Sequence, residues 1–159
     1  MLRSLVMATL GALIAGAGCG GGEGAGEPLV SSSLAGVYAN QAFTPAFGVA
    51  TVYMTDNLIA IGDGPLNCGS AQRSAPPSGT NAVLYVPMLD VGTYSGVFVD
   101  MIQSKGNNFA GYGSNSGTVT ITAASAASIV GTVSYSDTDS TTNKAYSISG
   151  SFEVSRCPM

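Results

Sequence analysis

The last third of the chain alternates apolar and polar residues with a period of two. Residues 146–154 (YSISGSFEV) place Tyr, Ile, Gly, Phe and Val on one side and three Ser and a Glu on the other, and residues 129–135 (IVGTVSY) alternate in the same way. A strand gathers such residues on one face, whereas helical spacing does not. We therefore predict two half-buried antiparallel strands, joined by an exposed loop over residues 136–144.

Five further runs upstream are rich in β-branched, aromatic and other apolar residues and are separated by turn-forming residues. They cover residues 49–55, 58–62, 82–88, 93–102 and 118–122. About eight short strands with turn signals between them predict an all-β fold, a single antiparallel β-sandwich or barrel. No amphipathic helix longer than two turns is expected.

Turn chemistry gives finer expectations. Asp56 and Asn57 lie between two apolar runs and both tolerate positive φ, so they predict a tight hairpin turn. Pro87 marks the end or the edge of a strand, since it has no N–H for the ladder. Residues 63–80 are rich in Gly, Pro and Ser and predict a loop, which contains Cys68.

Length and charge limit the possible partners. The chain has 159 residues, enough for one domain of ordinary size, and a net charge of −4 with only five Lys and Arg. So few cations cannot neutralise a run of phosphates, which excludes nucleic acid as a partner. Purely electrostatic attachment to anionic lipid is excluded for the same reason.

The N-terminus has the three parts of a secretory signal. Arg3 precedes an apolar stretch at residues 5–15, and Gly16, Ala17 and Gly18 supply small residues before Cys19. The stretch is shorter than the ~20 apolar residues that span a bilayer. A core helix is the alternative, but glycine costs a helix about 1 kcal/mol relative to alanine, and this segment has several. We expect residues 1–18 to be removed on export.

A signal that ends in small residues directly before a cysteine resembles the lipobox of bacterial lipoproteins, and this resemblance covers residues 1–19. It implies that Cys19 is lipidated on its thiol and becomes an acylated N-terminus that anchors the chain in a membrane. Gly16 departs from the family's preference for Leu at that place, so ordinary secretion stays an alternative. Gly20 is not the Asp that retains some lipoproteins at the inner membrane, which favours the outer membrane or the cell surface.

The segment after Cys19 is a predicted tether. Residues 20–27 (GGGEGAGE) are mostly glycine and behave as a flexible linker. Pro28 ends the glycine-rich stretch. We expect residues 19–33 to comprise the lipidated Cys19 and the tether, and the folded domain to begin near Leu34 and to span residues 34–159.

Three cysteines are an odd number for an exported protein. If Cys19 carries lipid, then Cys68 and Cys157 remain as a pair, and an oxidising compartment favours a disulfide between them. Two free thiols are the alternative. Neither cysteine has a CxxC neighbour, so nothing supports a redox or zinc role.

Catalytic chemistry has little support. The chain has no His, which excludes Ser-His-Asp and Cys-His catalysis. A pair of carboxylates could hydrolyse glycosides, and Asp90, Asp100 and Glu153 are candidates. No spacing selects a pair among the nine acidic residues, so we interpret them as solvated surface groups. We therefore predict a protein that is not an enzyme and needs no cofactor.

Residues 137–141 (DTDST) superficially resemble a calcium-binding loop. An EF-hand loop needs Gly at its sixth place and Glu at its twelfth, and Thr142 and Ile148 stand there instead. We interpret the segment as a polar hairpin loop without a metal.

Residues 103–117 (QSKGNNFAGYGSNSG) combine two aromatic rings with Gly, Ser and Asn. Recognition loops use such mixtures, so Asn108, Phe109 and Tyr112 are candidate binding residues in a loop. The alternative, which we favour, is that both rings turn inward and close the end of the core. The absence of Trp weakens the case for sugar binding.

Two functions stay open at this stage. The first is a lipid-anchored, non-enzymatic lipoprotein of the bacterial cell envelope with a structural or interaction role. The second is a ligand-binding module that recognises a glycan or a surface protein through residues 103–117. Exposure of the rings of Phe109 and Tyr112 would favour the second.

Overall fold

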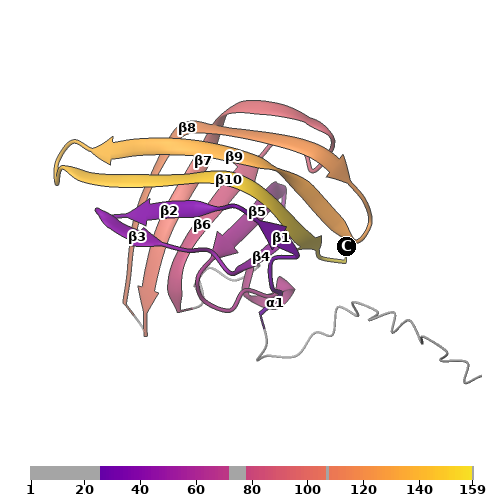
Figure 1. Cartoon of the computed structure of the whole chain (residues 1–159), viewed down its shortest axis with the longest axis horizontal. Coiled ribbons are helices and arrows are strands. Elements are labelled where there is room, and N and C mark those ends of the chain that lie inside the picture. The colour runs from indigo at the N-terminus through magenta and orange to yellow at the C-terminus, as the bar shows by residue number, and fades with distance from the viewer. Residues whose placement is uncertain (1–25, 72–77, 107, 159) are drawn as a thin grey trace, which may run out of the picture.

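A computed structural model describes residues 26–71, 78–106 and 108–158. The predicted signal, Cys19 and residues 20–25 of the predicted tether lie outside these residues. The described chain is all-β, as predicted, with ten strands and one short helix (Figure 1). The elements are β1 (Ser31–Ser32), β2 (Ala35–Tyr38), β3 (Gln41–Phe43), β4 (Phe47–Tyr53), β5 (Asp56–Gly62), α1 (Cys68–Ala71), β6 (Gly79–Val86), β7 (Gly92–Lys105), β8 (Asn108–Ala124), β9 (Ser128–Asp139) and β10 (Lys144–Arg156).

All ten strands belong to one sheet, in which the pairings from β4 to β10 form a closed circuit. Hydrogen bonds link β4 through β9 in sequence order, and β10 pairs with β9 on one edge and with β4 on the other. The β4–β10 contact is parallel, with Ser155 opposite Val49, so the expectation of a wholly antiparallel sheet was wrong at this point. The expected number of about eight strands was also too low.

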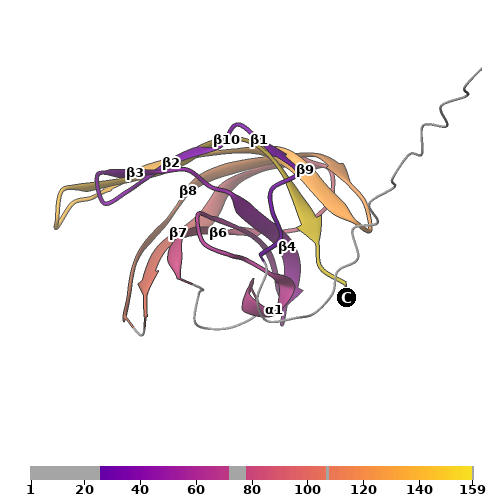
Figure 2. The ribbon, with the colours of Figure 1, turned by 60° about the horizontal axis from the view of Figure 1, so that its bottom comes forward.

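The short N-terminal strands extend the sheet along β10. The β1 strand pairs with β10 at Phe152 and Glu153, and β2 pairs with residues 147–149. The β3 strand lies outside β2 and forms the end of this branch. Figure 2 shows these strands and the β9–β10 hairpin as an upper layer over β4, β6 and β7.

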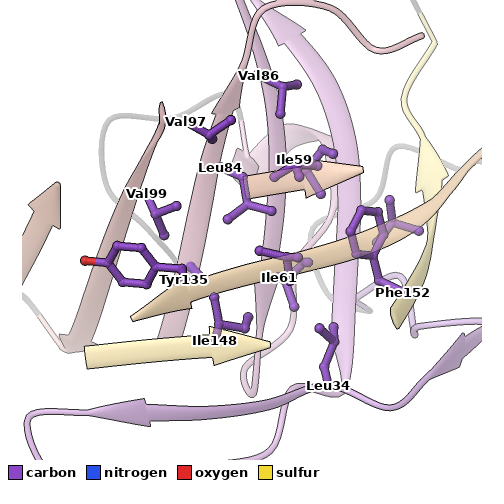
Figure 3. Packing of buried hydrophobic residues seen from close by; sticks show 14 of the residues in the cluster. Leu34, Ile59, Ile61, Leu84, Val86, Val97, Val99, Tyr135, Ile148 and Phe152 are labelled. Carbon is purple, nitrogen blue, oxygen red and sulfur yellow. The ribbon is translucent and has the colours of Figure 1, made fainter. Parts of the chain in front are cut away.

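The core lies between the layers and follows the predicted alternation. Ile129, Val133 and Tyr135 of β9 are buried, as are Ile148 and Phe152 of β10. Figure 3 shows how several of these side chains face the apolar residues of β5, β6 and β7. The buried faces predicted for both strands are confirmed.

Several strands are longer than their apolar runs. The expected loop at residues 136–144 shortens to a turn over residues 140–143, because Lys144 pairs with Asp139. The expected loop at residues 103–117 is wrong as well, since these residues form the end of β7 and much of β8. Hairpin pairing supplies their backbone hydrogen bonds and overrides the low strand propensity of Gly, Ser and Asn.

The β4–β5 turn lies two residues before its expected position. Met54 and Thr55 form it, while Asp56 is already paired with Tyr53, so the assignment of the turn to Asp56 and Asn57 was wrong. Met54 has a φ of 54°, and the Asn57 side-chain amide donates to the Pro87 carbonyl at 2.8 Å. Cross-strand register therefore fixes the turn against local residue preference. The predicted strand end before Pro87 is confirmed, because β6 ends at Val86.

A second, smaller core lies outside β4 and β5. Val49, Ala60, Leu66 and Cys157 are buried there, with Cys68 packed beside them. Cys68 and Cys157 form a disulfide with their Cα atoms 5.5 Å apart, so the predicted pair is confirmed in the structure. The bond ties the end of the chain to the loop that carries α1.

Backbone contacts between the N-terminal segment and the β-domain begin before Leu34. The Glu27 amide donates to the Leu66 carbonyl at 2.6 Å, and Pro28 forms a bridge with Phe47. Residues 27–33 therefore join the domain, although the sequence placed them in the tether. Within the described residues, no helix is long and apolar enough to cross a membrane.

Candidate functional site

The candidate residues of segment 103–117 lie on the β7–β8 hairpin, on two opposite faces. Asn108 pairs with Lys105 next to the hairpin turn, and the register then places Phe109 opposite Ser104 and Tyr112 opposite Met101. Phe109 is 59% exposed. Tyr112 packs against the main core instead. Because side chains alternate along a strand, the hairpin presents one ring outward and the other inward.

Tyr112 belongs to a cluster of three tyrosine rings from three strands. Its ring stacks on Tyr146 of β10 with centroids 4.5 Å apart, and Tyr38 of β2 meets Tyr146 edge-on at 5.3 Å. The Tyr38 hydroxyl donates to the Ala110 carbonyl of β8 at 2.7 Å. The cluster joins β2, β8 and β10 at this end of the core, which is the inward role that the sequence analysis favoured for Tyr112. Phe109 does not share it.

The tyrosine cluster lies where β8 and β9 part. Their pairing stops at Thr118 and Ser134. Beyond that point, within the described residues, residues 108–117 pair with β7 alone and residues 135–139 pair with β10 alone. The sheet is therefore open along one edge of β8, which we call the free β8 edge (residues 108–117).

Side chains partly bridge this opening. The Asp137 carboxylate of β9 accepts hydrogen bonds from the Ser114 hydroxyl, the Thr138 amide and the Tyr112 hydroxyl, which lower its pKa. Burial and then the hydrogen bond to Asp137 raise the pKa of Tyr112. The carboxylate of Asp137 is thus already occupied by donors from its own chain.

The outward face of β7 carries aromatic and acidic side chains beside the free β8 edge. Phe98 is 37% exposed and meets Tyr85 of β6 edge-on at 5.6 Å. Asp100 follows on the same face, and burial raises the pKa of its carboxyl. No hydrogen bond or ion pair with the Asp100 carboxylate is found in the part of the chain that the structure describes.

Two glycines leave β8 bare beside these side chains. A Cβ built on Gly113 would come within 2.6 Å of the Phe98 ring, which lies over this glycine. A Cβ on Gly111 would meet nothing closer than the Asp100 carboxylate, at 3.5 Å, and Ile102 at 3.8 Å. Phe98, Asp100, Ile102 and Gly111 together form what we call the Asp100 notch, an open acidic site against an apolar wall.

The three candidate catalytic carboxylates lie on separate parts of the sheet. Asp90 is in the β6–β7 loop, Asp100 is on β7 and Glu153 is on β10. Glu153 and Asp100 are on strands with β8 and β9 between them along the circuit. The three candidates therefore come from three separate elements of the fold.

The carboxylate of Asp139 forms hydrogen bonds within the β9–β10 turn. The Asp139 carboxylate accepts hydrogen bonds from the Thr141 amide and the Thr142 hydroxyl, and Asn143 closes the turn with a φ of 55°. Those two bonds lower the pKa of Asp139. Within the described ranges, no group of three His, Cys, Asp or Glu side chains could hold a metal ion.

Sequence reasoning missed Phe98 as a surface residue and the partnership of Tyr38 and Tyr146 with Tyr112. Alternation within residues 108–114 could have indicated the latter, since Asn, Ala, Tyr and Ser alternate there with Phe and two Gly. The glycines hid this pattern by resembling a loop.

No protein-family model, curated protein or solved structure matches the chain.

Proposed function

We propose that the protein is a lipid-anchored, non-enzymatic lipoprotein of the bacterial cell envelope, attached through Cys19 at its outer membrane or cell surface. Its folded domain serves an interaction role. The β-domain acts outside the cytoplasm, at the end of a short glycine-rich tether.

The observation that carries this proposal is the disulfide between Cys68 and Cys157. A disulfide is expected in an oxidising compartment and rare in a bacterial cytoplasm, which supports export. It also uses two of the three cysteines and leaves Cys19 over, directly after the signal-like segment. A leftover cysteine at that position suits lipid attachment.

A ligand-binding module is the second candidate, for which the exposed Phe109 and Phe98 are the supporting observation. The site would be the outward face of the β7–β8 hairpin rather than a loop. For the architecture, we favour a closed barrel over a sandwich, because each strand from β4 to β10 is hydrogen-bonded to its neighbours around the circuit.

The test is the chemical identity of the mature N-terminus. The full chain is expressed in a bacterium that processes lipoproteins, and we expect mass spectrometry to find an acylated Cys19 and a membrane-bound protein. Cys19→Ala should move the protein to the soluble exported fraction, while the matched control Ser33→Ala should stay in the membrane. An unmodified N-terminus away from Cys19 would contradict lipidation.

A further inference from the structure

We propose that the free β8 edge and the Asp100 notch together bind an extended, basic peptide segment of a partner protein, which adds to the sheet as a strand beside β8. This inference deepens the interaction role proposed above and does not depend on the lipid anchor. It assigns the partner a chemistry: a strand with Lys or Arg at alternate positions.

The backbone of β8 supplies the first requirement. An unpaired strand edge presents N–H and C=O groups that can pair with another extended chain. The Ala110 carbonyl points away from β7, because it accepts the Tyr38 hydroxyl. Residues of an antiparallel strand alternate in the edge to which their backbone groups point, so Asn108 and Tyr112 also direct theirs to the free edge.

The two glycines of β8 supply the second requirement. Adjacent strands lie about 4.8 Å apart, so an added strand would lie about 10 Å from β7. Gly111 has no side chain between that strand and Asp100, and a Cβ placed on it would meet its nearest neighbour, the Asp100 carboxylate, only at 3.5 Å. A long side chain of the added strand can therefore cross β8 and reach the carboxylate.

Charge selects the occupant. The Asp100 carboxylate is half-buried, and no cation or hydrogen-bond donor contacts it among the described residues. The chain as a whole has a net charge of −4, which also favours a basic partner. A Lys or Arg of the added strand would form an ion pair with the Asp100 carboxylate. It could also contact the Phe98 ring, because the face of an aromatic ring attracts cations. On the opposite face, the carboxylate of Asp137 is already hydrogen-bonded to its own chain, so small polar residues suit the intervening positions.

The experiment measures binding of a labelled, acetylated octapeptide of alternating Thr and Lys to the purified full chain by fluorescence anisotropy. A peptide with the same composition but four Thr followed by four Lys is the control for nonspecific attraction to an acidic protein. Alternating Thr and Glu is the control for charge sign. We expect the alternating Lys peptide to bind at least about tenfold more tightly than either control.

Variants of the protein locate the site. Asp100→Asn should weaken binding at least about tenfold, because it removes the negative charge that the Lys ammonium would pair with. Asp90→Asn makes the same charge change in the β6–β7 loop and should leave binding unchanged. Gly111→Val fills the notch and should weaken binding while keeping the fold. Hydrogen exchange read by mass spectrometry should show that the peptide protects residues 108–117.

The proposal would be overturned by equal binding of the alternating and block peptides, by equal effects of Asp100→Asn and Asp90→Asn, or by protection elsewhere than β8. Sedimentation of the free chain as a dimer, with protected residues 108–117, would assign the edge to a second copy and also overturn it. If the peptide binds as expected but Cys19 carries no lipid, only the proposed anchor fails.

Discussion

The two sides of the sheet are held together by different means. Where β4 and β5 meet the chain end, a buried apolar cluster and the Cys68–Cys157 disulfide close the structure covalently. Where β8 and β9 part, three tyrosine rings and the hydrogen bonds of Asp137 connect β8 to β2, β9 and β10 along a stretch in which the backbone of β8 pairs with β7 alone. The first side resists opening, while the second leaves a strand edge accessible. This difference indicates where the domain is stabilised and where it can accept a partner.

The disulfide should give the largest effect on stability. Cys68→Ser opens a loop with a sequence separation of 89 residues, for which the chain-entropy model gives about 4–5 kcal/mol. Under oxidising conditions, we expect the Cys68→Ser variant to have a much lower melting temperature than the parent protein. With reductant present, the two proteins should melt alike. Equal melting in both conditions would mean that the bond does not stabilise the fold.

Truncating the tyrosine cluster should give the second-largest loss of stability. Tyr112→Ala removes a ring stacked on Tyr146 and should cost about 3 kcal/mol, the lower end for truncating a core aromatic residue. Phe109→Ala, three residues away on the same strand, removes an exposed ring and should change stability by less than about 0.5 kcal/mol. Urea denaturation of both variants gives the comparison. Similar losses would show that the two faces of the hairpin are not distinct.

Alanine at two glycines contrasts the paired and unpaired parts of β8 and β9. A Cβ on Gly131 would lie 2.3 Å from the Thr120 carbonyl, so Gly131→Ala should cost about 1–3 kcal/mol. A Cβ on Gly111 would make only ordinary van der Waals contacts, the nearest at 3.5 Å, so Gly111→Ala should be neutral within about 0.5 kcal/mol. The free energies of unfolding of the two variants give the comparison, and an equal cost would show that the face of β8 at Gly111 is as crowded as that of β9 at Gly131.

The smallest effect is expected at Asp100 and depends on pH. Burial raises the folded-state pKa of Asp100 above the reference value of 3.8. Between the two pKa values the folded protein holds a proton that the unfolded chain has released, so stability falls as pH rises through this window. Asp100→Asn should therefore raise the melting temperature slightly at pH 7 and leave it unchanged below pH 3.8. A lower melting temperature at pH 7 would point to an unseen partner for the carboxylate.

The parts of the fold that sequence predicted were those with clear alternation. The buried faces of β9 and β10 follow directly from Ile, Val, Tyr and Phe at every second position. The disulfide followed from counting cysteines rather than from local pattern. The parallel contact between β4 and β10 left no signal, because only two residues of each strand take part in it.

The candidate site was harder to predict because it consists of small residues. Gly111 and Gly113 resemble a loop in the sequence, yet in the sheet they are the bare surface beside Asp100. The pairing of Tyr112 with Tyr146 joins residues 34 positions apart, and no local propensity encodes it. Only the register of β8 against β7 shows that Phe109 and Tyr112 face opposite ways.

Hydrogen exchange of the free, full chain tests the contrast between the two sides most directly. Residues 118–121 of β8 have a paired strand on each side, whereas residues 108–117 have one only on the β7 side. We predict strong protection of nearly all amides in the first segment and protection of only about half in the second, since alternate amides point to the free edge. Uniform strong protection along the whole of β8 would contradict an open edge and, with it, the proposed site for a partner strand.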